Sequence, residues 1–394
     1  MTGSEVRRQG DTPIADTITW ELLHELAAFR ARRGLALSAY LDLDPAQTLT
    51  PDALGTRVNS LLEAAERREV ELRADLTHEQ LLALREDLER VGDFFVHLDR
   101  EGVRGAAVFA SSLDGLWRPL ALAGPVEDAA WVDSVLHLAP LVPLADRGEG
   151  ALVAVVGGEQ GLLYRLRDGR LVEIADRSEE LMFSRHDQGG WSQARYQRSV
   201  EKERRDHLRR VAGTLAALHR PATPCVVLAV HDEKTRAAFE DELPHDVRRS
   251  IAGAVHAPAH AGPGELLGLV EPVLERWRAR REEEVVARWR EELGRDGRAT
   301  AGWSDTLPAA SDGRVELLLY DPRTDRHVWR CPSCGRLAPD GGTCPLEGVE
   351  LERRGDGIGL VLQQTLAHGG VARAVLAHRE ELRSAGGVGA LLRF

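Results

Sequence analysis

Length, composition and charge exclude several classes of protein for this chain of 394 residues. Since domains usually contain about 100–200 residues, the length predicts two or three domains, and we expect three. The composition, 43% apolar and 29% charged residues, is typical of a globular protein. The sequence has no run of about 18 apolar residues, which a membrane-spanning helix needs. The net charge of −12 opposes general nucleic-acid binding, so a site for nucleic acid has to come from a local pattern.

The first segment, residues 1–148, is predicted to be a mixed α/β domain. Leucines at helical spacing predict helices at 20–32, 56–72 and 77–91. Thr77 and Gln80 form a capping-box pattern at the start of the third helix. Apolar runs predict strands at 35–44, 105–111, 117–123 and 137–145.

The second segment, residues 149–264, begins with apolar runs at 151–166 and 170–176, whose glycine-containing turns predict hairpins. A small sheet or partial barrel follows from this pattern. A long basic helix is predicted from about Ser192 to Leu218. A buried strand at 224–230, a helix at 233–242 and a strand at 250–258 complete the segment, and the breaker-rich AHAGPGE sets its end near residue 264.

The third segment, residues 265–394, opens with a long charged helix at 265–294 that contains Pro272. A short helix, the strand RVELLLYD, a cysteine-containing insert at 327–350 and the amphipathic LVLQQTLAHGG come next, and the strands ARAVLAH and GGVGALLRF end the chain. This alternation predicts a compact α/β domain. The whole chain is therefore expected to be a mixed α+β protein of three domains.

A glycine loop before the basic helix is the first candidate site. Gly189 and Gly190 reach backbone conformations closed to other residues, so the loop can bring bare amides against a ligand. The flanking cations suit a phosphate-rich partner. The candidate RNA-binding residues are Arg185, Trp191, Arg195, Arg198, Lys202, Arg205 and Arg209. An ordinary surface turn followed by a solvated charged helix is the alternative.

The cysteine insert is the second candidate site. Cys331-Pro-Ser-Cys334-Gly335 has the form of a zinc knuckle, and Cys344-Pro-Leu-Glu347-Gly348 repeats it with glutamate in the fourth ligand position. Zinc prefers four ligands and accepts carboxylate oxygen, so Glu347 or His327 could complete a structural Zn²⁺ site of a small zinc-ribbon-like insert. A ribbon that no longer holds metal is the alternative. Cys225 lies in an apolar run and is expected in the core.

In this order of segments the sequence resembles the archaeo-eukaryotic class 1 peptide-chain release factors, and specifically their bacterial relatives. That family carries Gly-Gly-Gln on a loop, then Ser, Arg-aromatic-x-Arg and a basic helix ending Arg-basic-Val-Ala. Here Gly189-Gly190 is followed at the same spacing by Ser192, Arg195-Tyr196-Gln197-Arg198 and Arg209-Arg210-Val211-Ala212. The ending GGVGALLRF also resembles the family's last strand.

Two departures shape what the resemblance implies. Trp191 stands where the family has glutamine, and Gln193 makes a Gly-x-x-Gln pattern similar to the ribosome quality-control branch of the superfamily. The resemblance implies Gly189, Gly190 and Gln193 as catalytic residues for hydrolysis of peptidyl-tRNA. Arg57-Val58-Asn59 is present, but the family's preceding Asn-Ile-Lys-Ser is replaced by Ala53-Leu-Gly-Thr56, so stop-codon reading is expected to be absent.

The implied function is that of a cytoplasmic, monomeric factor that enters the ribosomal A site, contacts rRNA and peptidyl-tRNA, and works in ribosome rescue or quality control, with a translational GTPase as a candidate partner. The polar start MTGSEVRRQG agrees with the cytoplasm, and no membrane contact is expected. A non-catalytic ribosome-binding stress or hibernation factor stays open as the alternative. An enzyme acting on free tRNA is less favoured, because the sequence holds no nuclease-like carboxylate cluster.

Overall fold

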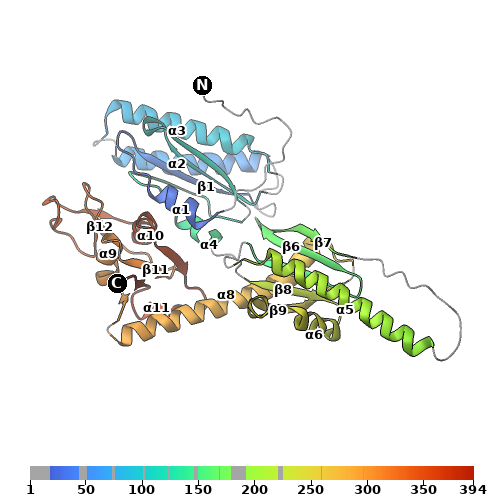
Figure 1. The fold of residues 1–394 in the computed structure, drawn as a ribbon. Helices are drawn as coiled ribbons and strands as arrows, with labels where there is room; N and C mark the ends of the chain where they lie inside the picture. The colour runs from blue at the N-terminus through green and yellow to red at the C-terminus, as the bar shows by residue number, and fades with distance from the viewer. Residues whose placement is uncertain are drawn as a thin grey trace, which may run out of the picture. The chain divides into compact units, whose positions relative to one another are not determined.

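The computed structural model describes residues 18–43, 51–72, 76–100, 103–122, 124–145, 150–167, 169–178, 192–220, 225–258, 260–295 and 297–394. The described residues form two compact units, one drawn from Met1–Asp146 and Glu282–Phe394 and the other from Arg147–Arg281 (Figure 1). Among the helices that the structure describes, none combines the length and the apolar character needed to cross a lipid bilayer.

The first unit contains an antiparallel sheet in the order β3-β2-β1-β4. Its strands are β1 (Ala36–Asp42), β2 (Gly105–Ser111), β3 (Leu116–Leu122) and β4 (Ala129–Asp133), with the short 3-10 helix η1 (Ser112–Asp114) between β2 and β3. The helices α2 (Pro51–Leu72) and α3 (His78–His97) pack on one face through leucines and Phe95. The predicted capping box is confirmed, since Thr77 and Gln80 exchange both hydrogen bonds.

The other face of this sheet shares a core with helices from the end of the chain. These are α1 (Trp20–Ala27), the short η2 (Ala139–Leu141) and α4 (Val142–Ala145), and then α9 (Trp303–Ser311) and α10 (Gly357–Ala367). Within that core, the buried amide of Gln363 donates to the carbonyl of Ala27 at 3.1 Å. Residues 18–145 and 282–394 are therefore held together by one continuous apolar core.

The prediction of a strand at 137–145 is wrong. Pro140 and Pro143 have no amide hydrogen to donate to a sheet ladder, and these residues form η2 and α4 instead. The strand that borders β1 on the side away from β2 is β4, which the sequence analysis did not identify because its burial is only partial.

A second sheet in the same unit has the order β10-β16-β11-β15. Its strands are β10 (Ala299–Ala301), β11 (Val315–Tyr320), β15 (Val371–Ala374) and β16 (Val388–Leu392), of which β11 and β15 run parallel. On one face lie α9 and α10; on the other, Val286 and Trp289 of α8 (Pro263–Gly294) pack with Leu382 of α11 (Arg379–Arg383). The cysteine insert is a small sheet of β12 (Val328–Arg330), β13 (Leu337–Ala338) and β14 (Glu352–Arg354).

The second unit is a five-stranded open sheet in the order β7-β6-β5-β8-β9. The strands are β5 (Leu152–Val156), β6 (Gly161–Arg167), β7 (Arg170–Asp176), β8 (Val226–Val230) and β9 (Ile251–His256). The predicted hairpins join β5, β6 and β7, whereas β5, β8 and β9 run parallel. One face carries α5 (Ser192–Leu218), α6 (Glu233–Glu242) and α7 (His245–Arg249), and the other carries the first turns of α8 (Figure 1).

Candidate nucleic-acid interface and cysteine centre

The basic helix α5 has the predicted bounds, Ser192–Leu218. Leu208, Val211 and Leu215 recur at helical spacing and are buried against the sheet of the second unit. Gly161 of β6 permits the close approach, because a Cβ there would lie 2.6 Å from a methyl group of Val211. The apolar stripe thus fixes the second half of the helix on the sheet.

The glycine-loop residues Arg185, Gly189, Gly190 and Trp191 lie outside the described residues. Gln193 and Arg195 belong to the first turn of α5, where the structure describes the backbone and not their side chains. Their proposed roles therefore stay predictions. Arg198 and Lys202 follow on the same helix with exposed side chains.

Two of the candidate RNA-binding arginines share one carboxylate. The Nε atoms of Arg205 and Arg209 each lie 3.0 Å from a different oxygen of Glu242 on α6. Hydrogen bonds from Arg205 and then Arg209 hold the pKa of Glu242 below its ordinary value. The side chain of Glu242 is 12% exposed, but those of Arg205 and Arg209 are 70% and 59% exposed, so both guanidinium groups still reach solvent.

A hydrogen-bond network that the sequence analysis missed connects α5 to the β5–β6 turn. His207, buried beside Leu208, contacts the carbonyl of Gln160 through Nε2 at 3.0 Å. A carbonyl only accepts, so Nε2 carries the proton. The Gln160 side-chain oxygen in turn lies 3.0 Å from Nε2 of His231, just after β8. The only sequence signal was the position of His207 next to the apolar stripe of the helix.

The three cysteines of the insert come together as predicted. Sulfur atoms of Cys331, Cys334 and Cys344 all lie within 4.8 Å of one another, and the Cys334 and Cys344 sulfurs are 3.7 Å apart. Four thiolates around zinc at about 2.3 Å place sulfurs about 3.8 Å apart in a tetrahedron, so this spacing fits a zinc ion. The three cysteines are thus a donor set that suits structural zinc.

Both turns of the insert have the same backbone form. The amide of Gly335 donates to the Cys331 carbonyl at 3.0 Å, and the amide of Gly348 donates to the Cys344 carbonyl at 2.9 Å. Both glycines have positive φ, 81° and 68°, which glycine adopts without strain. The turn that contains Cys331 and Cys334 and the turn that contains Cys344 therefore have the same knuckle conformation, as the repeated sequence predicts.

Neither residue predicted as the fourth zinc ligand lies in the cysteine cluster. Among the described donors, Glu347 and His327 are not part of the close cluster. The Glu347 carboxylate is exposed and lies 3.4 Å from the hydroxyl of Ser333. By contrast, Cys225 is buried in the core as expected, and burial raises the pKa of its thiol to about 12.

Two sequence comparisons find similarity to peptide-chain release factors. Residues 137–275 match the model of Bacterial archaeo-eukaryotic release factor family 10, a span that contains the glycine loop and α5. Peptide chain release factor subunit 1 of Archaeoglobus fulgidus is 26% identical over 286 residues, which are 66% of this chain and 70% of that protein.

Two solved structures are similar over most of the chain. The archaeal translation termination factor aRF1 is 16% identical with a TM-score of 0.27, and the match covers 96% of this chain and 99% of that one. The archaeal Pelota of a ribosome-bound model with ABCE1 is 14% identical with a TM-score of 0.38, covering 96% and 95%.

Proposed function

We propose that the chain, whose residues 137–275 match the model of Bacterial archaeo-eukaryotic release factor family 10, is a ribosome-associated translation factor that enters the A site without reading stop codons. The match of residues 137–275 carries this proposal, since it includes the loop and helix that would contact the tRNA. In this proposal residues 1–148, 149–264 and 265–394 act as three functional domains of a cytoplasmic monomer.

The helix α5 supplies the cations for rRNA and tRNA. Arg198, Lys202, Arg205 and Arg209 are exposed on it, and exposed arginines and lysines can replace the counterions of a phosphate backbone. Pairing of Arg205 and Arg209 with Glu242 occupies Nε and holds the two side chains in place. The outer N–H groups of Arg205 then approach phosphate with less loss of conformational entropy, whereas Nη1 of Arg209 also lies 3.4 Å from Asp206.

The reaction proposed for the glycine loop is hydrolysis of the ester of peptidyl-tRNA during ribosome rescue. Gly189 and Gly190 give the loop its shape, water attacks the ester carbonyl, and a backbone amide near Trp191 donates to the tetrahedral oxyanion. Collapse of this intermediate breaks the ester bond, and the 3′-oxygen of the tRNA leaves with a proton from the attacking water. Gln193 orients the water or the ribose hydroxyl. No titrating residue is needed, because amides aimed at a developing oxyanion lower the barrier by several kcal/mol.

A peptide-release assay tests the catalytic proposal. Purified protein is added to stalled ribosomes that carry labelled peptidyl-tRNA, and wild type is compared with Gln193→Ala. We expect release by the wild type and a loss of about 100-fold in the variant, as for removal of a group that acts at the transition state. Equal release by both proteins removes Gln193 from the mechanism, and no release by either removes the hydrolase function.

Cosedimentation tests ribosome binding separately. Lys202→Gln combined with Arg205→Gln should weaken the binding to ribosomes and reduce its dependence on salt. Arg295→Gln is the control, because Arg295 follows α8 directly, is 67% exposed and lies outside the proposed interface. Equal binding of both variants would contradict the role of α5.

A non-catalytic ribosome-binding factor for stress or hibernation is the second candidate. It is favoured by one observation, the tryptophan at position 191 where the family has its glutamine. Ribosome binding without peptide release would support this candidate. In both cases a translational GTPase is a candidate partner, and the three cysteines hold a structural Zn²⁺ that takes no part in the chemistry.

A further inference from the structure

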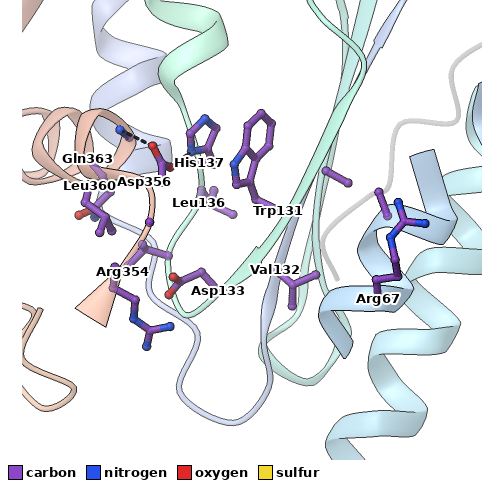
Figure 2. A pocket seen from close by; sticks show the side chains of 15 residues that line it. Arg67, Trp131, Val132, Asp133, Leu136, His137, Arg354, Asp356, Leu360 and Gln363 are labelled. Atoms are coloured by element: carbon purple, nitrogen blue, oxygen red, sulfur yellow. Dashed lines mark hydrogen bonds and ion pairs between the residues drawn. The ribbon is translucent and has the colours of Figure 1, made fainter. Parts of the chain in front are cut away.

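A groove of about 490 Å³ in the first unit has no place in the proposed function. It follows β4, the edge strand of the first sheet, between Ala64 and Arg67 of α2 and Gly359 and Gln363 of α10 (Figure 2). Sites for small organic ligands range from about 300 to 1,000 Å³ and combine apolar walls with a few polar groups. The groove has the size of such a site.

A histidine held by a carboxylate lines the groove. The ring of His137 lies with Nδ1 2.7 Å from Oδ2 of Asp356, the N-cap residue of α10. Because the carboxylate accepts, Nδ1 donates, and Nε2 of the neutral ring is a hydrogen-bond acceptor. Nε2 has no hydrogen-bond partner among the described residues. The groove therefore presents an oriented acceptor to a ligand.

The absence of a side chain at Gly359 leaves space for the His137 and Asp356 pair. A Cβ at position 359 would overlap Oδ2 of Asp356 and would lie 2.5 Å from Cε1 of His137. Glycine is thus required at position 359 for Asp356 and His137 to meet. The backbone amide of Gly359 also donates to the other Asp356 oxygen at 2.8 Å, so the carboxylate is held from two sides.

An aromatic surface lies next to the acceptor. Trp131 of β4 stacks on His137 with ring centroids 3.7 Å apart and an angle of 14° between the planes, and both rings line the groove (Figure 2). Half-buried tryptophan is a common platform for nucleobases, because every base has a flat face that can stack. The Trp131 and His137 pair offers such a platform.

One exposed arginine at the groove is available to an anionic ligand group. Asp133 forms an ion pair with Arg330 at 2.6 Å, and the Asp356 carboxylate accepts hydrogen bonds from His137 and from the Gly359 amide. Arg67 forms no ion pair with another described residue, and its side chain is exposed at the groove. Arg354 lies at the opposite wall and is already paired with Glu352, whose Oε2 lies 2.5 Å from its Nη2. An acidic ligand group would therefore pair with Arg67.

We propose that this groove binds a nucleotide, either free or as one residue of an RNA strand. The base stacks at Trp131, an amino or hydroxyl group of the nucleotide donates to Nε2 of His137, and the phosphate pairs with Arg67. This site is independent of the glycine loop and of peptidyl-tRNA hydrolysis.

Isothermal titration of the full-length protein tests the proposal with defined probes: AMP, ribose 5-phosphate, adenosine and a single-stranded oligoribonucleotide of five adenosines. We expect AMP to bind more tightly than ribose 5-phosphate, which lacks the base, and than adenosine, which lacks the phosphate. Arg67→Gln and His137→Phe should each weaken AMP about tenfold, equivalent to ~1.4 kcal/mol. Phenylalanine keeps a ring against Trp131 but offers no acceptor.

Arg118→Gln is the matched control, because Arg118 is exposed on β3 at the other edge of the same sheet. It should bind all four probes as the wild type does. If the groove variants lose binding of the oligonucleotide but not of AMP, the ligand is a residue of an RNA strand. If they lose binding of AMP, the ligand is a free nucleotide. The proposal is overturned if neither AMP nor the oligonucleotide binds at millimolar concentration, or if Arg67→Gln binds both like the wild type. Since Arg67 is exposed, that variant is expected to fold.

Discussion

Glu242 is the residue that changes the interpretation of the basic helix. Counting cations along α5 predicts a row of phosphate contacts, but the structure pairs Arg205 and Arg209 with this carboxylate from α6. The partner lies 33 and 37 positions further along the chain, beyond the reach of any local pattern. Glu242 is therefore expected to position the arginines as well as to stabilise the unit.

Replacing Glu242 with glutamine should lower the free energy of unfolding at pH 7 by about 1 kcal/mol, the upper range for exposed ion pairs. The folded-state pKa of Glu242 lies below its ordinary value of 4.5, so its stabilisation is complete above that pH. It is lost as the pH falls through the lowered folded-state pKa. Urea unfolding of wild type and variant should show the full difference at pH 7 and a smaller difference at pH 3.

Glu233→Gln is the control on the same helix. Its carboxylate is 73% exposed and pairs with Arg236 three residues away. Such a pair contributes little, so the change should stay within about 0.5 kcal/mol. A larger effect from Glu233→Gln than from Glu242→Gln would contradict the importance assigned to the shared carboxylate.

Gly161 is the second residue with a specific steric role. Gly161→Ala should destabilise the second unit by about 1–3 kcal/mol, because the new methyl group would lie 2.6 Å from a Val211 methyl and 3.1 Å from the backbone of Arg177. Adding Val211→Ala removes one of these contacts. Urea unfolding should then show a double mutant less destabilised than the sum of the single changes; strict additivity would argue that the helix does not press on this glycine.

At the scale of elements, local patterns predicted most helices well. The bounds of α5 are those expected, and α6, α8 and α10 lie where helical spacing placed them. The hairpins of β5, β6 and β7 also follow from their turns. The error at 137–145 arises because apolar content alone does not distinguish a buried short helix from a strand, whereas its two prolines oppose a strand. The missed strand β4 has a different cause, since its partial burial leaves no clear apolar run.

The cysteine insert was predicted as an element, and its metal can be tested directly. Protein purified without an affinity tag should contain about one zinc per chain. Cys344→Ser should lose the metal, and the melting temperature should fall, because metal binding to the folded form contributes to its stability. Elemental analysis and thermal unfolding measure the two effects.

Cys225→Ala is the control for that experiment. Cys225 lies in the core of the second unit, apart from the insert, and should keep the full zinc content. Zinc in the Cys344→Ser protein at the wild-type level would show that the three thiols are not the site. Absence of zinc from the wild type would favour a ribbon that has lost metal binding.

For the whole molecule, the sequence suggested where segments begin and end but not which of them share a core. Residues 1–148 and 265–394 were assigned to separate domains, whereas Tyr40 and Phe109 lie in the same apolar cluster as Leu362 and Leu366. The amphipathic pattern of each segment shows that one of its faces is buried, but not which other segment covers that face. Contacts between residues more than 200 positions apart therefore cannot be predicted from periodicity. The nucleotide groove was missed for the same reason, since α2, β4 and α10 come together only in the fold.

The shared core makes a prediction about cooperativity. Leu362→Ala in α10 should cost about 2–5 kcal/mol, as for other fully buried leucines. Because α10 and the first sheet belong to one core, hydrogen exchange should accelerate in β1 and β2 as well as in β11 and β16. Leu228→Ala in the second unit is the matched change, since Leu228 is equally buried in a separate cluster. It should accelerate exchange in β5 and β8 and leave β1 as in the wild type. If Leu362→Ala affects only β11 and β16, the two parts of the first unit unfold independently, and the nucleotide groove between α2 and α10 would lack a rigid frame.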